Sequence, residues 1–139
     1  MILKKLNRES YKKDLLDKFD YCVKEKNDKE IVLYGGYVRN SSVTIKKEWI
    51  DWIVNTLRSM LPLDYYDPSS IKMKKNEDCL LTVEKIVTYK NLSWFEIYTQ
   101  KYTEHKRTPP FTIPYLLDNP QKMKSYIEPV LCELEKYAL

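Results

Sequence analysis

The side chains best suited to nucleophilic chemistry in this sequence are three cysteines and one histidine. Cys22, Cys79 and Cys132 are far apart, none belongs to a Cys-x-x-Cys pair, and each lies in an otherwise apolar run. A cysteine nucleophile needs an imidazole beside it and a third group that orients the ring, whereas His105 stands in a polar stretch. The pattern predicts three buried free thiols and a solvated imidazole. A disulfide framework or a metal site would need paired spacing and more ligands.

Carboxylates that could hold a catalytic metal occur in the segment 79–102. A metal-dependent nuclease needs two or three carboxylates and a lysine that converge at strand ends, and Glu84, Lys85 and Glu96 are available. Adjacent residues of a strand point to opposite faces, so Glu84 and Lys85 would not converge. We therefore expect solvated strand residues or a cross-strand Glu–Lys pair, and neither an enzyme nor a cofactor.

Aromatic and basic residues alternate in and after the segment 92–102, which suggests nucleic-acid binding. The two-residue period of a strand places Trp94, Tyr98 and Tyr102 on one face. If Phe95 and Ile97 face the core, the first three rings form an exposed row, on which each stacked base would contribute about 1–3 kcal/mol. The cations that accompany this row are Lys101, Lys106 and Arg107. If helices cover both faces of the sheet, the same rings are core, and Glu96 in the middle of the row favours this interpretation.

A protein-binding surface is the other class of function that the composition suggests. Twelve tyrosines and three tryptophans exceed what a core of this size obviously needs, and these residue types are enriched at interface centres. The predicted loops contain the candidate partner-binding residues Tyr65, Tyr66, Pro109, Pro110, Phe111 and Tyr115. The alternative is that these rings pack as lids over the core.

A predicted hairpin between Cys79 and Tyr102 must position most of these residues. Both of its halves are rich in Leu, Val, Ile, Thr and aromatic residues, contain no Gly or Pro, and are separated by Lys90-Asn91. A hairpin alone is marginally stable in water, so other elements must cover it.

Three amphipathic helices are predicted to provide that cover. Apolar residues recur at helical spacing in the segments 10–26 and 46–61, and Asn119 followed by Pro120 is a strong start for a final helix. Pro129 lies inside this last helix, where proline costs about 3 kcal/mol, and it predicts a kink or a break near residues 126–128.

The remaining segments are predicted to be strands and connections. The segment 30–39 is predicted to be a strand in which Gly35-Gly36 marks a bulge, a bend or a close backbone approach, and the segment 43–45 a short return strand. The segment 62–78 is predicted to be a long surface connection. The three prolines of the segment 103–114 predict an extended path outside the sheet.

The sequence as a whole predicts a single α+β domain over residues 1–139, with a small, mainly antiparallel sheet of 3–4 strands and three helices in the order α-β-(β)-α-β-β-α. The net charge of +4 is spread along the chain. The use of Lys, Asn, Ile and Tyr in place of Arg, Gly and Ala suggests an AT-rich genome. No run resembles a membrane span or a secretory signal, so we expect an intracellular protein. These features favour a non-enzymatic binding protein of the adaptor, inhibitor or immunity type, with a protein partner, and nucleic-acid binding as the alternative.

Overall fold

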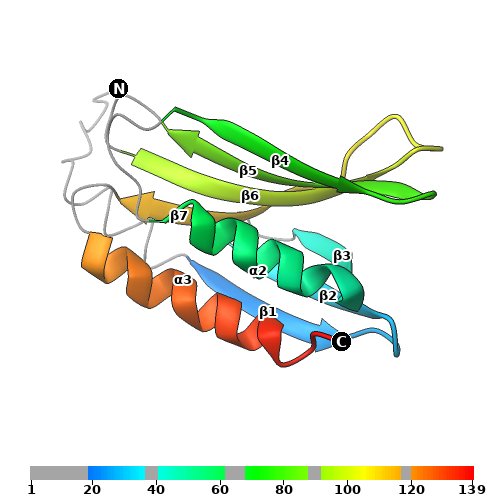
Figure 1. Ribbon diagram of the computed structural model, residues 1–139, viewed down its shortest axis with the longest axis horizontal. Coiled ribbons are helices and arrows are strands. Elements are labelled where there is room, and N and C mark those ends of the chain that lie inside the picture. Colours follow the sequence, from blue (N-terminus) through cyan, green and yellow to red (C-terminus); the bar gives the residue numbers. More distant parts are fainter. Residues whose placement is uncertain (1–18, 37–40, 62–67, 88–91, 117–119) are drawn as a thin grey trace, which may run out of the picture.

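The computed structural model describes residues 19–36, 41–61, 68–87, 92–116 and 120–139, which form two antiparallel sheets and two α-helices (Figure 1). The elements follow one another as β1 (Asp20–Glu25), β2 (Glu30–Gly36), β3 (Ser42–Lys46), η1 (Lys47–Trp49), α2 (Ile50–Ser59), β4 (Ser70–Lys75), β5 (Cys79–Val87), β6 (Leu92–Lys101), β7 (Phe111–Leu116) and α3 (Pro120–Glu135). The predicted α+β class is confirmed. The prediction of one sheet with three helices is wrong in detail, because the described strands form two sheets.

The first sheet has the strand order β1-β2-β3. The predicted strands at 30–39 and 43–45 correspond to β2 and β3, while residues 37–40 lie outside the described part of the chain. Gly35 has a positive φ of 86° and pairs with Tyr21 across the ladder. A Cβ atom at this glycine would lie 2.7 Å from the carbonyl oxygen of Asp20. The glycine therefore allows two backbones to approach closely.

The prediction of a helix over residues 10–26 is wrong for its described C-terminal part, which is strand β1. Exposure alternates along this strand, with Val23 buried and Cys22 and Lys24 exposed. The ladder joins β1 to β2 from the pair Asp20–Gly36 to the pair Glu25–Ile31. Pairing with the next strand in a hairpin has overridden the helical spacing of the apolar residues. Residues 10–18 lie outside the described residues.

The second sheet has the strand order β4-β5-β6-β7 and contains the predicted hairpin as β5 and β6. The segment 62–78 is not simply a surface connection, because Ser70–Lys75 forms the edge strand β4, in which Ile71 and Met73 alternate with lysines. The segment 103–114 does not stay outside the sheet either. Pro114 lies within the opposite edge strand β7, where a missing backbone donor is tolerated.

The predicted helix at 46–61 is confirmed as η1 followed by α2, and the predicted C-terminal helix is confirmed as α3. The predicted break near Pro129 is wrong, since α3 is one uninterrupted helix from Pro120 to Glu135. Pro129 is exposed, so the carbonyl that lacks its donor lies on the solvent side, where water can hydrate it. The proposed cap, Asn119, lies outside the described residues.

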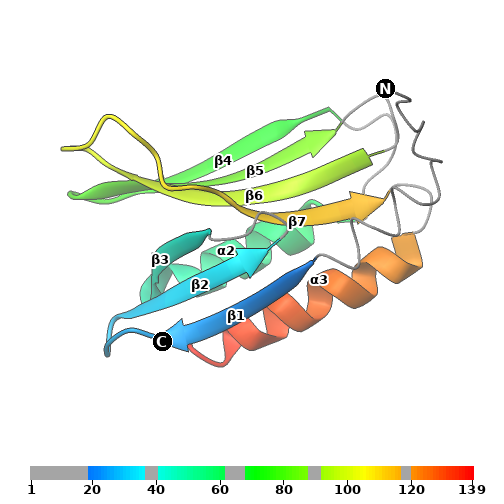
Figure 2. The ribbon, with the colours of Figure 1, turned by 180° about the vertical axis from the view of Figure 1, so that it is seen from behind.

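The main core lies between the two helices and the two sheets. Figures 1 and 2 show α2 and α3 side by side on one face of the β1-β2-β3 sheet, with the four-stranded sheet along one edge of both, so that β7 contacts β2 as well as α3. The core is filled by Leu33, Ile45, Ile53, Leu57, Phe95, Ile97, Ile113 and Leu131, each of which is fully buried. Arg58 of α2 forms ion pairs with Glu128 and Glu135 of α3 at the surface of the helix pair. Within the described residues, no helix has the length and apolar character needed to cross a membrane.

Candidate functional site

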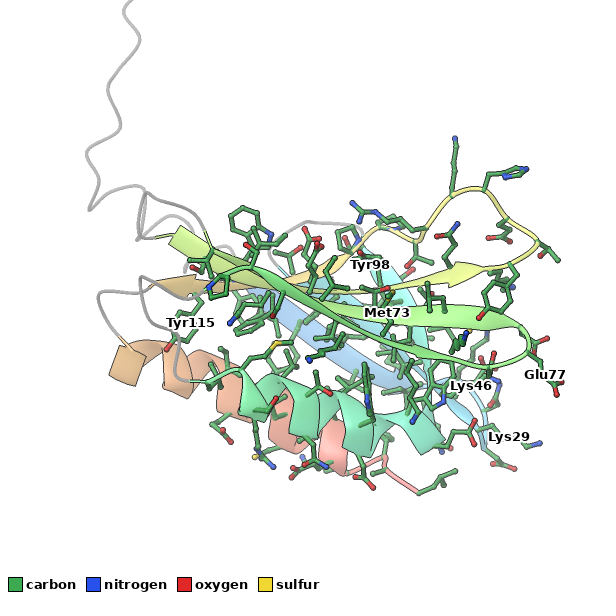
Figure 3. All side chains as sticks on the ribbon, turned by 45° about the horizontal axis from the view of Figure 1, so that its top comes forward. Lys29, Lys46, Met73, Glu77, Tyr98 and Tyr115 are labelled. Atoms are coloured by element: carbon green, nitrogen blue, oxygen red, sulfur yellow. The ribbon has the colours of Figure 1, made fainter. Side chains whose placement is uncertain are left out.

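The four-stranded sheet has one face in the core and one face turned away from it, which we call the outer face. Phe95 and Ile97 of β6 are fully buried, so their strand neighbours project from the other side. The register of the three ladders then assigns to the outer face the residues Ile71, Met73, Lys75, Leu80, Thr82, Glu84, Ile86, Trp94, Glu96, Tyr98, Gln100, Thr112 and Pro114. Figure 3 labels two of them, Met73 and Tyr98.

Large apolar side chains on this face are accessible to solvent. Ile71 and Met73 on the edge strand β4 are 51% and 60% exposed, which are high values for residues of this type. Trp94 and Tyr98 on β6 are half-buried, and Tyr102, just beyond β6, is 54% exposed. Ile71 lies directly opposite Glu84 in the β4–β5 ladder. The outer face therefore combines exposed aliphatic groups with half-exposed rings and a carboxyl group.

A cation already stacks on one of these rings. The guanidinium carbon of Arg107 lies 4.5 Å from the ring centroid of Tyr98. The loop that contains Arg107 is anchored beside β6, because the Thr108 amide donates to the Thr99 carbonyl at 2.8 Å and the Thr99 amide donates to Oγ1 of Thr108 at 3.1 Å. Of the predicted row of rings, Trp94 and Tyr98 project from the outer face and Tyr98 has a partner, whereas Tyr102 lies beyond β6 and lines a groove at that end of the molecule.

Two carboxyl groups face each other at the centre of the outer face. Glu84 of β5 and Glu96 of β6 are directly opposite in the ladder, and their carboxyl groups are close enough for a hydrogen bond when Glu84 is protonated. Nε1 of Trp94 donates to Oε1 of Glu96 at 3.2 Å. Burial raises the pKa of Glu84 above its usual value, the charge of Glu96 and the hydrogen bond between them raise it further, and Arg107 lowers it.

The raised pKa predicts that Glu84→Gln stabilises the protein near neutral pH. Folding favours the protonated form of Glu84, so the contribution of this group is largest below its unfolded pKa and is lost as the pH rises through the folded pKa. We expect the variant to have a higher melting temperature than the wild type at about pH 7 and the same one at about pH 3, where carboxyl groups are protonated. Thermal unfolding followed over a pH series measures this. A variant that is less stable at every pH would contradict it.

The residues expected to bind a protein partner do not lie together on one surface. Tyr65 and Tyr66 lie outside the described residues. Pro109 is exposed and Pro110 half-buried in the loop before β7. The nearby prolines predict a loop for Phe111 and Tyr115. Both residues instead lie in β7, where they are buried in the core. Their rings pack beneath the sheet and are not proposed as contacts.

The cations expected to accompany the row of rings are dispersed. Lys106 and Arg107 are exposed in the loop after β6. Lys101 is exposed at the end of β6, opposite Cys79, and lines a groove at that end of the molecule rather than the outer face. Of the three, only Arg107 has a ring contact on the outer face.

The groove that includes Lys101 has a volume of about 1000 Å³ and mixed charge. It lies where the turns β1–β2 and β4–β5 meet the start of α2, and Figure 3 labels three of its residues at this end. Its lining contains Asn27, Asp28, Lys29, Glu30, Lys46, Glu48, Glu77, Asp78, Cys79, Lys101, Tyr102, Thr103 and Leu139. Lysines and carboxylates alternate around this groove, so its lining does not select a ligand of one charge.

The prediction of three buried thiols is wrong. Cys22 and Cys132 are exposed and Cys79 is half-buried. Burial raises the pKa of the Cys79 thiol, which makes it a weaker nucleophile near neutral pH. His105 is exposed, as expected for a solvated imidazole.

The expected cross-strand Glu–Lys pair is wrong as well. Lys85 is only 9% exposed and lies opposite Phe95 on the inner face, so Glu84 meets Glu96 instead. Within the described part of the chain, no cluster of three His, Cys, Asp or Glu side chains could hold a metal ion. The sequence did not predict that Glu84 and Glu96 form a pair. The alternation of Ile71 and Met73 with lysines was the available signal for β4, the strand beside Glu84.

Comparison with protein-family models and with curated proteins finds no match for this chain.

Proposed function

We propose that this chain is a non-enzymatic binding protein that engages another protein through the outer face of its four-stranded sheet. The observation that supports this most directly is the exposure of Ile71 and Met73, which project from β4 on the same face as the half-exposed rings of Trp94 and Tyr98, with β5 between the two strands. Aromatic residues and methionine are enriched at interfaces, and large apolar groups clustered on a sheet face favour a docking partner over solvent. The partner would cover these four side chains and the outer face of β5 between them.

The carboxyl pair makes nucleic acid the weaker alternative. Glu96 lies between Trp94 and Tyr98 on β6, where the bases of a single strand would stack, and Glu84 lies opposite it on β5, so acidic charge at this position would repel phosphates. Arg107 already occupies a position over the ring of Tyr98. The exposed cations Lys106 and Arg107 are what remains in favour of this alternative.

The interface proposal predicts that the double variant Ile71→Ser, Met73→Ser loses the partner without losing the fold. Burial of an apolar side chain contributes about 1.5–3 kcal/mol, so two of them should change the affinity by at least about tenfold. The matched control is Tyr34→Ser, because Tyr34 is an exposed ring on the other sheet. Affinity capture from the native host, quantified by mass spectrometry, should recover a protein with the wild type and the control but not with the double variant. The captured protein is then purified and its affinity measured directly.

If the wild type, the control and the double variant all recover the same amount of the partner, the outer face is not the interface. Binding of oligonucleotides with a steep salt dependence that Arg107→Ala abolishes would favour the nucleic-acid alternative instead. Sedimentation of the purified chain over a concentration series tests whether the partner is a second copy.

A further inference from the structure

The carboxyl pair of the outer face has no cation bound to it. Among the residues that the structure describes, Glu84 and Glu96 form no ion pair, and their polar contacts are the hydrogen bond between them and the indole of Trp94. The cation that acts on Glu84 is Arg107 of the neighbouring loop, which stacks on Tyr98, while Lys75 of β4 lies opposite Leu80, four residues along β5 from Glu84. Two carboxyl groups held together in this way gain electrostatically from any cation that can reach both.

A second, independent feature beside the pair also lacks a partner. Thr112 of β7 lies directly opposite Glu96 in the β6–β7 ladder and therefore projects from the same face. Its residue is only 7% exposed, and its Oγ1 atom is buried without a hydrogen bond. An unsatisfied buried hydroxyl costs about 1–3 kcal/mol, so a donor would gain a hydrogen bond here if it entered this face and moved aside the side chains that close Oγ1 off from solvent.

Aromatic rings stand on both sides of Glu96, one of the two carboxyl groups. Trp94 and Tyr98 are the neighbours of Glu96 at two-residue spacing on β6, and all three project from the outer face. Ring faces attract cations, and Arg107 on Tyr98 shows that a guanidinium already finds this surface favourable. A planar cation can stack on the rings while its donors bind the carboxyl groups.

We propose that Glu84 and Glu96 receive an arginine side chain of the protein partner, between the rings of Trp94 and Tyr98. This inference rests on the proposed function and specifies the chemistry of the partner. Arginine suits the site better than lysine because its planar guanidinium carries five donors, enough to bind two carboxyl groups together. The partner's arginine would be surrounded by apolar groups that cover Ile71 and Met73.

The inference also defines how binding responds to pH and to Arg107. Protonation of Glu84, whose pKa is raised by burial, removes charge that holds the arginine, so affinity should fall as the pH is lowered, with Glu96 and Arg107 as the charged groups that act on Glu84. Arg107 is near enough to act on Glu84 and could compete for the pair. Arg107→Ala should therefore leave the affinity for an arginine probe unchanged or increase it.

The test uses N-acetyl-L-arginine amide as the probe, and the uncharged citrulline derivative as its isosteric control. In NMR titrations of the full chain, the arginine derivative should shift the signals of Glu84, Glu96 and Thr112 in a saturable way, and the citrulline derivative should not. The double variant Glu84→Gln, Glu96→Gln should weaken the arginine response at least about tenfold, and Thr112→Val should weaken it less. Equal shifts with both probes, or shifts that the Gln variant leaves unchanged, would overturn the inference.

Failure of this inference can be told apart from failure of the proposed interface. The Tyr34→Ser variant, changed on the other sheet, should bind the probe as the wild type does, whereas the captured protein is tested against the Ile71→Ser, Met73→Ser variant. If the captured protein dissociates from this variant but binds the Glu84→Gln, Glu96→Gln variant as tightly as the wild type, the interface stands and the arginine site is wrong. If the captured protein binds both variants normally, both proposals fail.

Discussion

Replacement of Phe95 by alanine should lower the free energy of unfolding by about 3–5 kcal/mol. The ring is fully buried on the inner face of β6, and its edge packs against the ring of Tyr115 with centroids 6.2 Å apart and an interplanar angle of 86°. The substitution removes both the buried apolar area and this ring contact, and the two flanking strands cannot collapse into the space without breaking the β6–β7 ladder. Denaturant unfolding with both fluorescence and circular dichroism measures the change.

The matched control for this prediction is Tyr98→Ala, three positions along the same strand on the outer face. That ring is half-exposed, so its loss should cost far less, about 1 kcal/mol. Since 3–5 kcal/mol is a large part of the stability of a small protein, Phe95→Leu provides a milder variant that should still fold and should fall between the other two. If Tyr98→Ala costs as much as Phe95→Ala, the outer face is buried, and the surface on which both proposals depend does not exist.

The elements that were predicted correctly are those whose information is local. In β5 and β6, apolar and β-branched residues run through both strands without a Gly or Pro, and the two-residue period separates Phe95 and Ile97 from Trp94 and Tyr98. In α2, apolar residues recur at helical spacing over three turns. In both cases the pattern within one segment determines the type of element, and the structure adds only the partner.

The errors occur where the partner of a segment, rather than the pattern within it, decides the structure. The segment 20–25 carries apolar residues at helical spacing, yet pairing with β2 makes it a strand. Pro114 argues against a strand unless that strand lies at an edge, and the sheet order that puts it there cannot be deduced from one sequence.

The candidate site depends on the same kind of information. Glu84 and Glu96 are separated by the hairpin turn, and a change of register by one residue would send one of them to the other face. Their meeting, and the position of Thr112 beside them, is a property of the ladders rather than of any short motif. This explains why the residue types were noticed from the sequence but not the pair they form.

Gly35→Ala should be the other strongly destabilising substitution, with a loss of about 2–4 kcal/mol in the free energy of unfolding. A φ of 86° is unfavourable for any L-residue with a side chain, which costs about 1–2 kcal/mol. The new Cβ atom would also lie 2.7 Å from the Asp20 carbonyl oxygen, and a backbone atom cannot move aside as a flexible side chain could. The strand β1 would have to separate from β2 at this point, which weakens the attachment of β1 to the rest of the first sheet.

Gly35→Asn distinguishes the two causes of this loss, because asparagine tolerates positive φ but still carries a Cβ atom. If the contact with Asp20 dominates, Ala and Asn should destabilise the protein equally, and hydrogen exchange should show reduced protection in β1 before the rest of the chain. If the backbone angle dominates, Asn should recover part of the loss. A Gly35→Ala variant as stable as the wild type would show that β1 does not approach β2 as closely as the pairing of Tyr21 with Gly35 requires.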